Sequence, residues 1–445
     1  MRLLLLFTIL LNSLLPASGQ SSLQRVWIDD LAASGQHITN IIGSNQLDSL
    51  SAEFMMEKII AAADQSFSLD ELTAVVKICS KYCNKSKSIS LLLTDWLREN
   101  NSINTNRSPI EAGQFRGYLL AALQQFPPNK ELYRCIKYEF VFNGHAFNIA
   151  AAALAARNFP DSSVELIPLM EPYLSGLFVD EWVDVTTPKL NYPIANPTKA
   201  RYEIIKTLVE FGPLAYRSVK LLDEIADVKN SGLFGADSVL GYRSLSAAKY
   251  IRKVTPPCCQ KEDNAIAVTK VIHLIAKSDR KQISTTGLQL MDQEGMSVKF
   301  DDLRNKPFVL TFFYTQCTND QKCVATVKRL GDLERECIQS NLQKTVGIYG
   351  MTYDPDFDSQ SILKKYGNLY GFLFDKQMKF LRTTNDFSSI SDQLGLRVNY
   401  GAGTVNQHGI QLFVFDKKGR VAAIFDNELW SAKEVKDCLV RLINE

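Results

Sequence analysis

The stretch FVLTFFYTQCTNDQKC, residues 308–323, decides the fold of the C-terminal part of this 445-residue chain. Its first half, FVLTFFY, is a continuous apolar run of strand length and predicts a buried β-strand. Residues 324–338 then predict a helix, and residues 346–352 predict a second buried strand. This order is a βαβ unit, with Cys317 and Cys323 at the turn that leads from the first strand into the helix.

The remaining elements complete one domain. We predict a helix at residues 360–366, a hairpin at 411–415 and 421–425, and a closing amphipathic helix at 431–444. Cys438 lies on the apolar face of that closing helix, which predicts a core residue. The order β-α-β-α-β-β-α is the layout of a thioredoxin fold, so we expect an α/β thioredoxin-like domain over residues 281–445.

The region before this domain has a different pattern. From Ser68 to Ala276, short segments with helical apolar spacing are separated by Pro, Gly and Asn, and almost none alternates like a strand. The breaks recur roughly every 35 to 50 residues, which is typical of stacked helix pairs. We therefore predict an all-α helical-repeat domain over residues 20–280. It resembles HEAT-type repeats, with an irregular helical bundle as the alternative, and the polar segment 277–286 places the domain boundary near residue 280.

The N-terminus predicts export. Arg2 precedes an apolar run from Leu3 to Leu15, and small residues follow at positions 17–19. This is the pattern of a signal peptide over residues 1–19, and the run is too short for a comfortable membrane span. We expect a periplasmic or otherwise extracytoplasmic protein that is soluble after cleavage and meets a membrane only through a partner. An uncleaved membrane anchor is the alternative.

The amino-acid composition of the chain limits the classes of partner that we expect it to bind. Lys plus Arg total 50 and Asp plus Glu total 48, a formal net charge of +2. Without a large field of one sign, the chain has no general attraction for polyanions, so nucleic acid is not an expected partner. The hydrophobic fraction of 46% is that of a globular protein rather than a disordered one.

Most of the nine cysteines and four histidines are expected to be structural. Cys79 and Cys83 are spaced for one helix face, but His is scarce and the pair lacks further ligands, so we interpret both as buried apolar residues. Cys258 and Cys259 adjoin two prolines in a loop, where they are structural or form a strained vicinal disulfide. Cys337 should lie about 20 Å from Cys323 along one helix, at 1.5 Å per residue. The remaining histidines, at 37, 145 and 273, lack nearby partners in sequence.

The chemistry is expected at Cys317 and Cys323. Backbone N–H groups and the positive end of a helix dipole favour thiolates at a helix start, and a thiolate either attacks a disulfide or binds a metal. The two cysteines are separated by five residues, whereas disulfide oxidoreductases use the shorter C-x-x-C. The wider loop suits two metal ligands better. Before the hairpin, where a thioredoxin has its cis-proline, the sequence TVNQHG places His408 instead.

Residues 288–445 resemble the SCO/SenC copper-chaperone family. The resemblance lies in FFYTQC with Cys317, in Cys323, in TYDPDFD at the end of the next strand and in NQHGIQLFVFDKKGR with His408. It implies copper, as Cu(I) or Cu(II), held by Cys317, Cys323 and His408. Two thiolates and an imidazole suit Cu(I) by softness and can hold Cu(II) with an added ligand.

The chain departs from the family pattern at several positions. Family members usually separate the cysteines by three residues and often place proline after each, where this chain has Thr318 and Val324. The acidic residue that often precedes the histidine is Gln407 here, and losing such a carboxylate lowers copper affinity by about 10-fold to 100-fold. We interpret Asp354, Asp356 and Asp358 as residues that shape their loop.

Three functions follow. The first is delivery of copper to a recipient protein, the family precedent being a subunit of cytochrome c oxidase, and this function needs no enzymatic turnover. The second is a thiol-disulfide oxidoreductase with Cys317 as nucleophile and Cys323 as resolving thiol. The third makes the helical repeats a protein-binding scaffold and the thioredoxin-like domain inactive.

Overall fold

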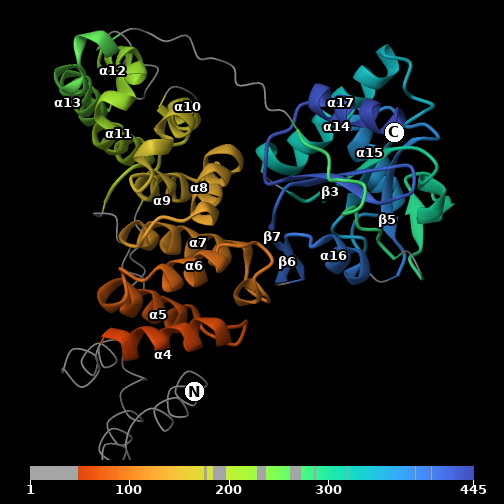
Figure 1. Ribbon diagram of the computed structural model, residues 1–445, viewed down its shortest axis with the longest axis horizontal. Coiled ribbons are helices and arrows are strands. Elements are labelled where there is room, and N and C mark those ends of the chain that lie inside the picture. Colours follow the sequence, from red (N-terminus) through yellow and green to blue (C-terminus); the bar gives the residue numbers. More distant parts are fainter. Residues whose placement is uncertain are drawn as a thin grey trace, which may run out of the picture. The chain divides into compact units, whose positions relative to one another are not determined.

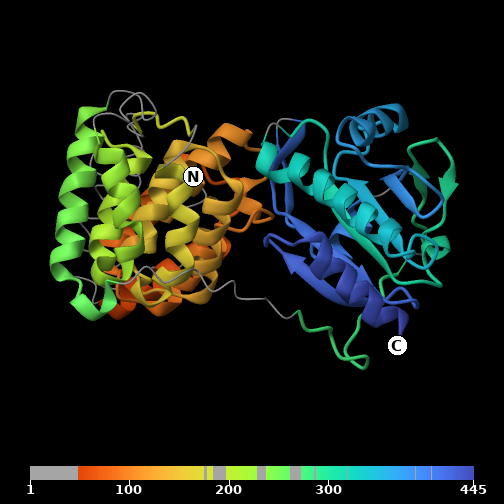
Figure 2. The same ribbon diagram turned by 90° about the horizontal axis from the view of Figure 1, so that it is seen from above.

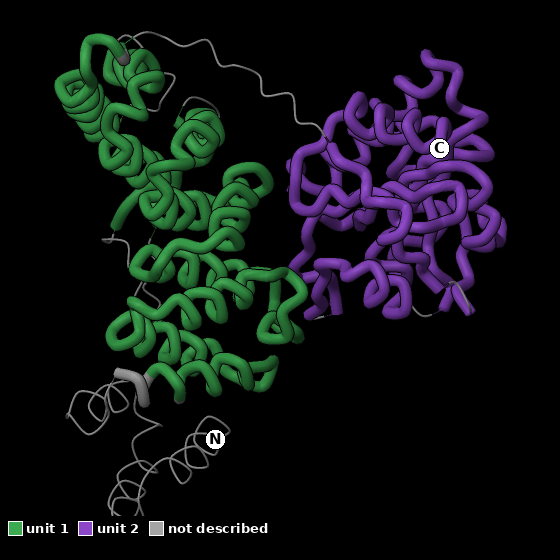
Figure 3. Tube along the Cα trace, in the orientation of Figure 1, with its two compact units in different colours: residues 1–266 green, residues 267–445 purple. Residues whose placement is uncertain are grey.

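The computed structural model describes residues 49–174, 178–183, 197–227, 237–260, 272–284, 287–317, 319–385, 387–401 and 403–445. The chain divides into two compact units, residues 1–266 and 267–445 (Figure 3). The predicted signal peptide at 1–19 and His37 lie outside the described residues. Within the described part, no helix combines the length and the hydropathy that a membrane span requires.

The first unit is helical, as predicted (Figure 1). Its α-helices are α4 (Ser49–Ala62), α5 (Leu69–Tyr82), α6 (Lys87–Asp95), α7 (Pro109–Ala122), α8 (Lys130–Phe142), α9 (Ala146–Ala156), α10 (Ser163–Leu174), α11 (Ala200–Phe211), α12 (Val219–Ala226) and α13 (Ser238–Val254). Local signals start several of them: Ser68 and Ser108 each form a capping box with a glutamate three residues later.

Alternate helices of this unit stack in two rows. One row runs α5, α7, α9, α11 and α13, and the other runs α4, α6, α8 and α10. The alanine-rich helix α9, AFNIAAAALAA, is buried over most of its length between α7 and α11, because small side chains allow helix backbones to approach closely. Cys79 and Cys83 belong to the core of this unit, as expected for small apolar residues.

Charged side chains are also buried in the helical unit, and they are paired. Arg116 on α7 lies 2.5 Å from Glu139 on α8 and 3.4 Å from Glu99. Farther along the chain, Arg157 lies 2.6 Å from Glu203. Removing a charge from water is costly, and each of these ions lies beside one of opposite sign.

The second unit is built on a seven-stranded mixed sheet of order β2-β1-β5-β4-β3-β8-β9. Its strands are β1 (Leu290–Asp292), β2 (Ser297–Val298), β3 (Phe308–Phe313), β4 (Gly347–Thr352), β5 (Met378–Thr383), β8 (Gln411–Phe415) and β9 (Val421–Asp426). A separate hairpin consists of β6 (Val398–Gly401) and β7 (Thr404–His408), and the helices are α14 (Ala325–Gln339), α15 (Gln360–Leu369), α16 (Ser388–Leu394) and α17 (Ala432–Ile443). Strand β3 pairs parallel to β4 and antiparallel to β8, which is the predicted thioredoxin-like arrangement.

Two apolar clusters cover the two faces of this sheet. Helices α14, α15 and α17 pack with alternate residues of β3, such as Val309 and Phe313, on one face. Helix α16 packs with Leu310 and Phe312 on the other face. Figure 2 shows α14, in teal, beside the closing helix α17, in blue. Cys337 and Cys438 are fully buried in the first cluster.

The sequence prediction omitted several strands. Strands β1 and β2 are only three and two residues long. Strand β5, MKFLRT, places Lys379 and Arg382 among apolar residues, so it lacks the continuous apolar run that marks β3 and β4. The hairpin β6–β7 was not predicted either, although it carries His408.

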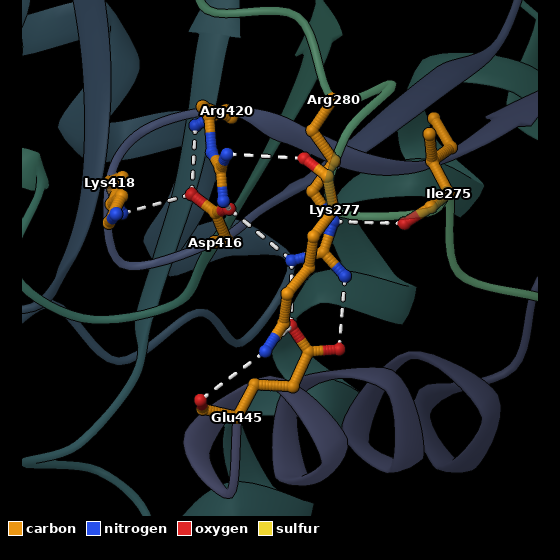
Figure 4. Close-up of polar contacts among 7 residues, drawn as sticks. All are labelled: Ile275, Lys277, Arg280, Asp416, Lys418, Arg420 and Glu445. Carbon is orange, nitrogen blue, oxygen red and sulfur yellow. Dashed lines mark hydrogen bonds and ion pairs between the residues drawn. The ribbon is translucent and has the colours of Figure 1, made fainter.

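A buried arginine fastens the start of this unit (Figure 4). Residues 272–281 lie along the hairpin β8–β9, with the Ile275 N–H donating to the Ala422 carbonyl. Arg280, whose side chain is 2% exposed, donates to the Ile275 carbonyl at 2.9 Å, to Asp416 at 3.3 Å and to Glu445 at 2.8 and 3.0 Å. One guanidinium thereby joins the incoming segment, the β8–β9 turn and the C-terminal residue.

Candidate metal centre

Cys317, Cys323 and His408 meet at one end of the sheet of the second unit. The Nε2 atom of His408 lies 3.5 Å from the Cys317 sulfur and 3.7 Å from the Cys323 sulfur. All three ligand atoms lie within 4.8 Å of one another. Among the described residues, these three side chains form a group that could hold a metal ion. Cys317 is half-buried, whereas Cys323 and His408 are buried.

The two cysteines are placed by the turn that follows β3. The Cys317 N–H donates to the Tyr314 carbonyl at 3.4 Å. Asn319 caps the next turn by accepting from the Gln321 N–H at 2.9 Å. Residues 320–324 form a single π-helical turn directly before α14. This turn is wider than an α-helical turn. Such turns are frequent at functional sites, and this one directs Cys323 into the interior.

His408 is oriented by its neighbour in the chain. Its Nδ1 atom lies 3.0 Å from the carbonyl oxygen of Gly409, an atom that can only accept. Nδ1 therefore donates to this carbonyl, which leaves Nε2 facing the two sulfurs. The ring packs between Tyr314 and Tyr353, with ring centroids 5.3 and 5.6 Å away.

A close backbone approach holds the turn after His408. The Gly409 N–H donates to the Arg397 carbonyl at 2.6 Å, and the Ile410 N–H donates to the Asn427 side chain at 2.7 Å. A Cβ atom at position 409 would lie 2.7 Å from the side-chain oxygen of Asn427. Only glycine fits at this position without displacing a neighbour.

The electrostatics separate the two thiols. A hydrogen bond from Cys323, supported by His408, holds the pKa of the Cys317 thiol well below its usual range. Burial raises the pKa of the Cys323 thiol well above its usual range. Cys317 is thus the half-exposed thiolate, and Cys323 is the buried thiol that donates to it.

Of the three aspartates after β4, Asp354 and Asp358 accept hydrogen bonds that fix their loop, whereas the loop-shaping role of Asp356 stays a prediction. The Phe357 N–H donates to the Asp354 side chain at 3.2 Å, and the Asp358 N–H donates to the Asp354 carbonyl at 2.9 Å. Asp356 is exposed, whereas Asp358 is buried beneath the loop that carries Cys317.

The other sequence candidates lie away from the centre. Cys79 and Cys83 are in the helical unit, and Cys258 is exposed there. His145 and His273 are exposed on the surface. Sequence reasoning missed Tyr353, Gly409 and Asn427, because their roles depend on contacts between segments distant in the chain and no local pattern marks them.

The donor set fits a soft metal ion. In comparable zinc sites, bonds to sulfur and imidazole nitrogen measure about 2.0 to 2.3 Å, so three ligands around one ion stand about 3.5 to 4 Å apart. The two nitrogen–sulfur distances of 3.5 and 3.7 Å fall in that range. Thiolates and imidazole favour copper, zinc and iron over calcium or magnesium.

Comparisons with known proteins give a family match for the C-terminal part of the chain. Residues 276–444 match the family model described as SCO1/SenC. No curated protein matched the chain.

Solved structures align with the same part of the chain. A SCO1/SenC family lipoprotein from Bacillus anthracis is 21% identical, covers 37% of this chain and 96% of its own, and gives a TM-score of 0.33. Copper-bound ScoI from Bradyrhizobium japonicum is 21% identical over 35% of this chain and 96% of its own, with a TM-score of 0.28. A secreted thiol-disulfide isomerase from Corynebacterium glutamicum is 18% identical over 40% of this chain and 95% of its own, with a TM-score of 0.29. The C-terminal part of this chain, residues 276–444, is thus similar to SCO1/SenC proteins by its family match.

Proposed function

We propose that this protein binds one copper ion through Cys317, Cys323 and His408 and delivers it to a recipient protein. The observation that carries the proposal is the convergence of the three ligand atoms within 4.8 Å, with Nε2 of His408 facing both sulfurs. The match of residues 276–444 to the SCO1/SenC family supports copper as the ion.

The protonation states of Cys317 and Cys323 fit a carrier that both takes up and releases copper. Cys317 is already a thiolate, so it can capture Cu(I) without first losing a proton. Cys323 holds its proton until the ion arrives, and binding then displaces it. The half-exposed position of Cys317 leaves one ligand accessible to an acceptor's thiol or imidazole, which ligand exchange requires.

The destination and compartment belong to the same proposal. The family precedent suggests a subunit of cytochrome c oxidase as recipient, and the N-terminal pattern at 1–19 suggests export to a periplasmic or other extracytoplasmic space. The helical unit, as a HEAT-like array, would bind a partner protein.

Copper titration of the purified full-length chain tests the proposal. We expect one Cu(I) per chain, measured by competition with a chromophoric chelator. His408→Ala and Cys317→Ser should each reduce binding below detection, whereas Cys337→Ser, which changes a buried thiol outside the centre, should bind like the wild type. Equal copper binding by the wild type and His408→Ala would contradict the proposed site.

A second function is supported by one specific observation. The half-exposed Cys317 thiolate lies beside the buried Cys323 thiol, the arrangement of a nucleophile and a resolving thiol. A reductase would use Cys317 to attack a partner's disulfide, and Cys323 would then release the reduced partner while Cys317 and Cys323 become the oxidised pair. Reduction of a model disulfide that persists in His408→Ala but stops in Cys323→Ser would favour this function over copper delivery.

A further inference from the structure

A buried carboxylate lies directly behind the loop that carries Cys317. Asp358, 0% exposed, follows the turn after β4. It accepts a hydrogen bond from the Thr315 N–H at 3.1 Å and further hydrogen bonds from the hydroxyls of Thr315 and Thr352. Both of its oxygens are therefore engaged by donors from two different segments.

These donors come from the ends of two neighbouring strands. Thr352 is the last residue of β4 and lies beside Phe313, the last residue of β3, in the parallel register. Thr315 follows Phe313 by two residues and precedes Cys317 by two. One carboxylate thus ties the first residues of the metal-binding loop to the end of the adjacent strand.

An anchor at the start of this loop matters because the loop is long. Five residues separate Cys317 from Cys323, and Val324 follows where a proline would limit the backbone. Fixing the backbone of one residue costs about 1 to 2 kcal/mol. The Cys317 N–H itself makes only a long hydrogen bond of 3.4 Å, to Tyr314.

The bonding also explains why the residue is acidic. Three donors converge on Asp358, and a carboxylate accepts through both oxygens, whereas an amide would place an N–H₂ group against one of them. Burying a carboxyl group is costly unless it is hydrogen-bonded, so the donors and the acid depend on one another.

We propose that Asp358 is a positioning residue, which holds Cys317 within reach of Cys323 and His408 before the metal binds. The inference rests on the proposed copper function, and it extends to the thiol pair without metal.

Two measurements on the full-length chain test the proposal. The first is Cu(I) affinity, and the second is the equilibrium constant for forming the Cys317–Cys323 disulfide with oxidised glutathione. Asp358→Ala should lower Cu(I) affinity by about 10-fold to 100-fold, as is typical for residues that orient metal ligands. It should also lower the disulfide equilibrium constant by about 10-fold, because a freer loop reduces the effective concentration of one thiol near the other. Asp358→Asn should show a smaller loss.

Matched variants separate positioning from general damage. Asp356→Asn removes an exposed carboxylate from the same loop and should match the wild type in both measurements. Thr315→Val removes one hydroxyl donor from Asp358 and should show part of the loss in both constants. Thr315→Ser keeps the hydroxyl and should match the wild type. If Asp358→Ala does not fold, the Thr315 pair decides the question.

The outcomes distinguish this inference from the copper proposal. If the Cu(I) affinities and disulfide equilibrium constants of Asp358→Ala and Thr315→Val lie within twofold of the wild type, Asp358 has no positioning role. This conclusion holds even if the wild type delivers copper as proposed. If the wild type binds no copper, the proposed function fails, and the glutathione equilibrium still decides the role of Asp358. A loss of thermal stability without a change in either constant would also overturn the inference.

Discussion

The two units each contain a buried ionisable cluster of a different kind. In the helical unit, Arg116 lies between Glu139 and Glu99, so positive and negative charges compensate one another inside the protein. In the second unit, two sulfurs and an imidazole nitrogen converge on a common point instead. The first arrangement is complete without a ligand, and the second is suited to one.

This difference shows how a structural cluster can be told from a functional one. A buried ion pair satisfies its own electrostatics, and its removal should damage only the fold. Three soft donors facing one point are suited to an ion, and their removal should mainly damage binding. The two units therefore predict opposite responses to mutation.

The largest effect on stability is expected from Arg116→Met. The substitution leaves Glu139 and Glu99 buried without their counter-charge, and it should lower the free energy of unfolding by about 3 to 5 kcal/mol. Chemical denaturation followed by circular dichroism measures the change. Arg98→Met removes an exposed pair with Asp95 and should cost less than about 1 kcal/mol. A greater loss in Arg98→Met than in Arg116→Met would contradict the comparison, as would a loss of copper binding in either.

The second unit also contains a buried structural cation, Arg280. Arg280→Met breaks its bonds to Asp416, Glu445 and the Ile275 carbonyl, and it should cost about 2 to 3 kcal/mol, because hydrogen bonds to charged groups are strong. Lys277→Met, at an exposed neighbour in Figure 4, should cost less than about 1 kcal/mol. Denaturation in urea compares the two, and equal losses would remove Arg280 from its anchoring role.

At Glu334 we predict a pH-dependent change in the free energy of unfolding of similar size. This residue of α14 is 0% exposed, and burial raises its pKa from about 4.5 to about 7. The folded chain keeps the proton between those pH values while the unfolded chain has lost it. The contribution of Glu334 to stability is therefore greatest below pH 4.5 and falls by up to about 3 kcal/mol as the pH rises through 7.

Glu334→Gln should remove this dependence. The amide oxygen can still accept from the Leu373 N–H, which lies 2.7 Å from Glu334 in the native chain. The variant should be more stable than the wild type at pH 8 and similar at pH 4. Glu336→Gln, at a partly exposed site, should retain the wild-type slope. A stability difference between Glu334→Gln and the wild type that stays constant from pH 4.5 to 8 would contradict the role given to Glu334.

The smallest expected effect concerns the metal centre. Gln407→Glu places a carboxylate beside His408 and should raise copper affinity by about 10-fold. Gln316→Glu adds the same charge next to Cys317 and serves as the control for net charge. Similar gains in both variants would attribute the effect to charge alone rather than to orientation of the imidazole.

Local patterns were sufficient for much of the second unit. Strands β3 and β4 appear as continuous apolar runs, and α17 as an amphipathic helix with Cys438 on its buried face. Strand β5 was missed because its charged residues interrupt the apolar pattern, although the sheet buries four of its six residues. The helical unit was recognised by its spacing, but the two rows of helices depend on which apolar faces meet.

The candidate site divides in the same way. The amino-acid sequence by itself placed Cys317 and Cys323 at a strand-to-helix turn, because both belong to one short segment whose pattern is local. Only the tertiary structure decided that His408, 91 residues beyond Cys317, turns Nε2 toward both sulfurs. That orientation comes from the Gly409 carbonyl and from the approach of Asn427, and contacts between distant segments exist only once the chain has folded.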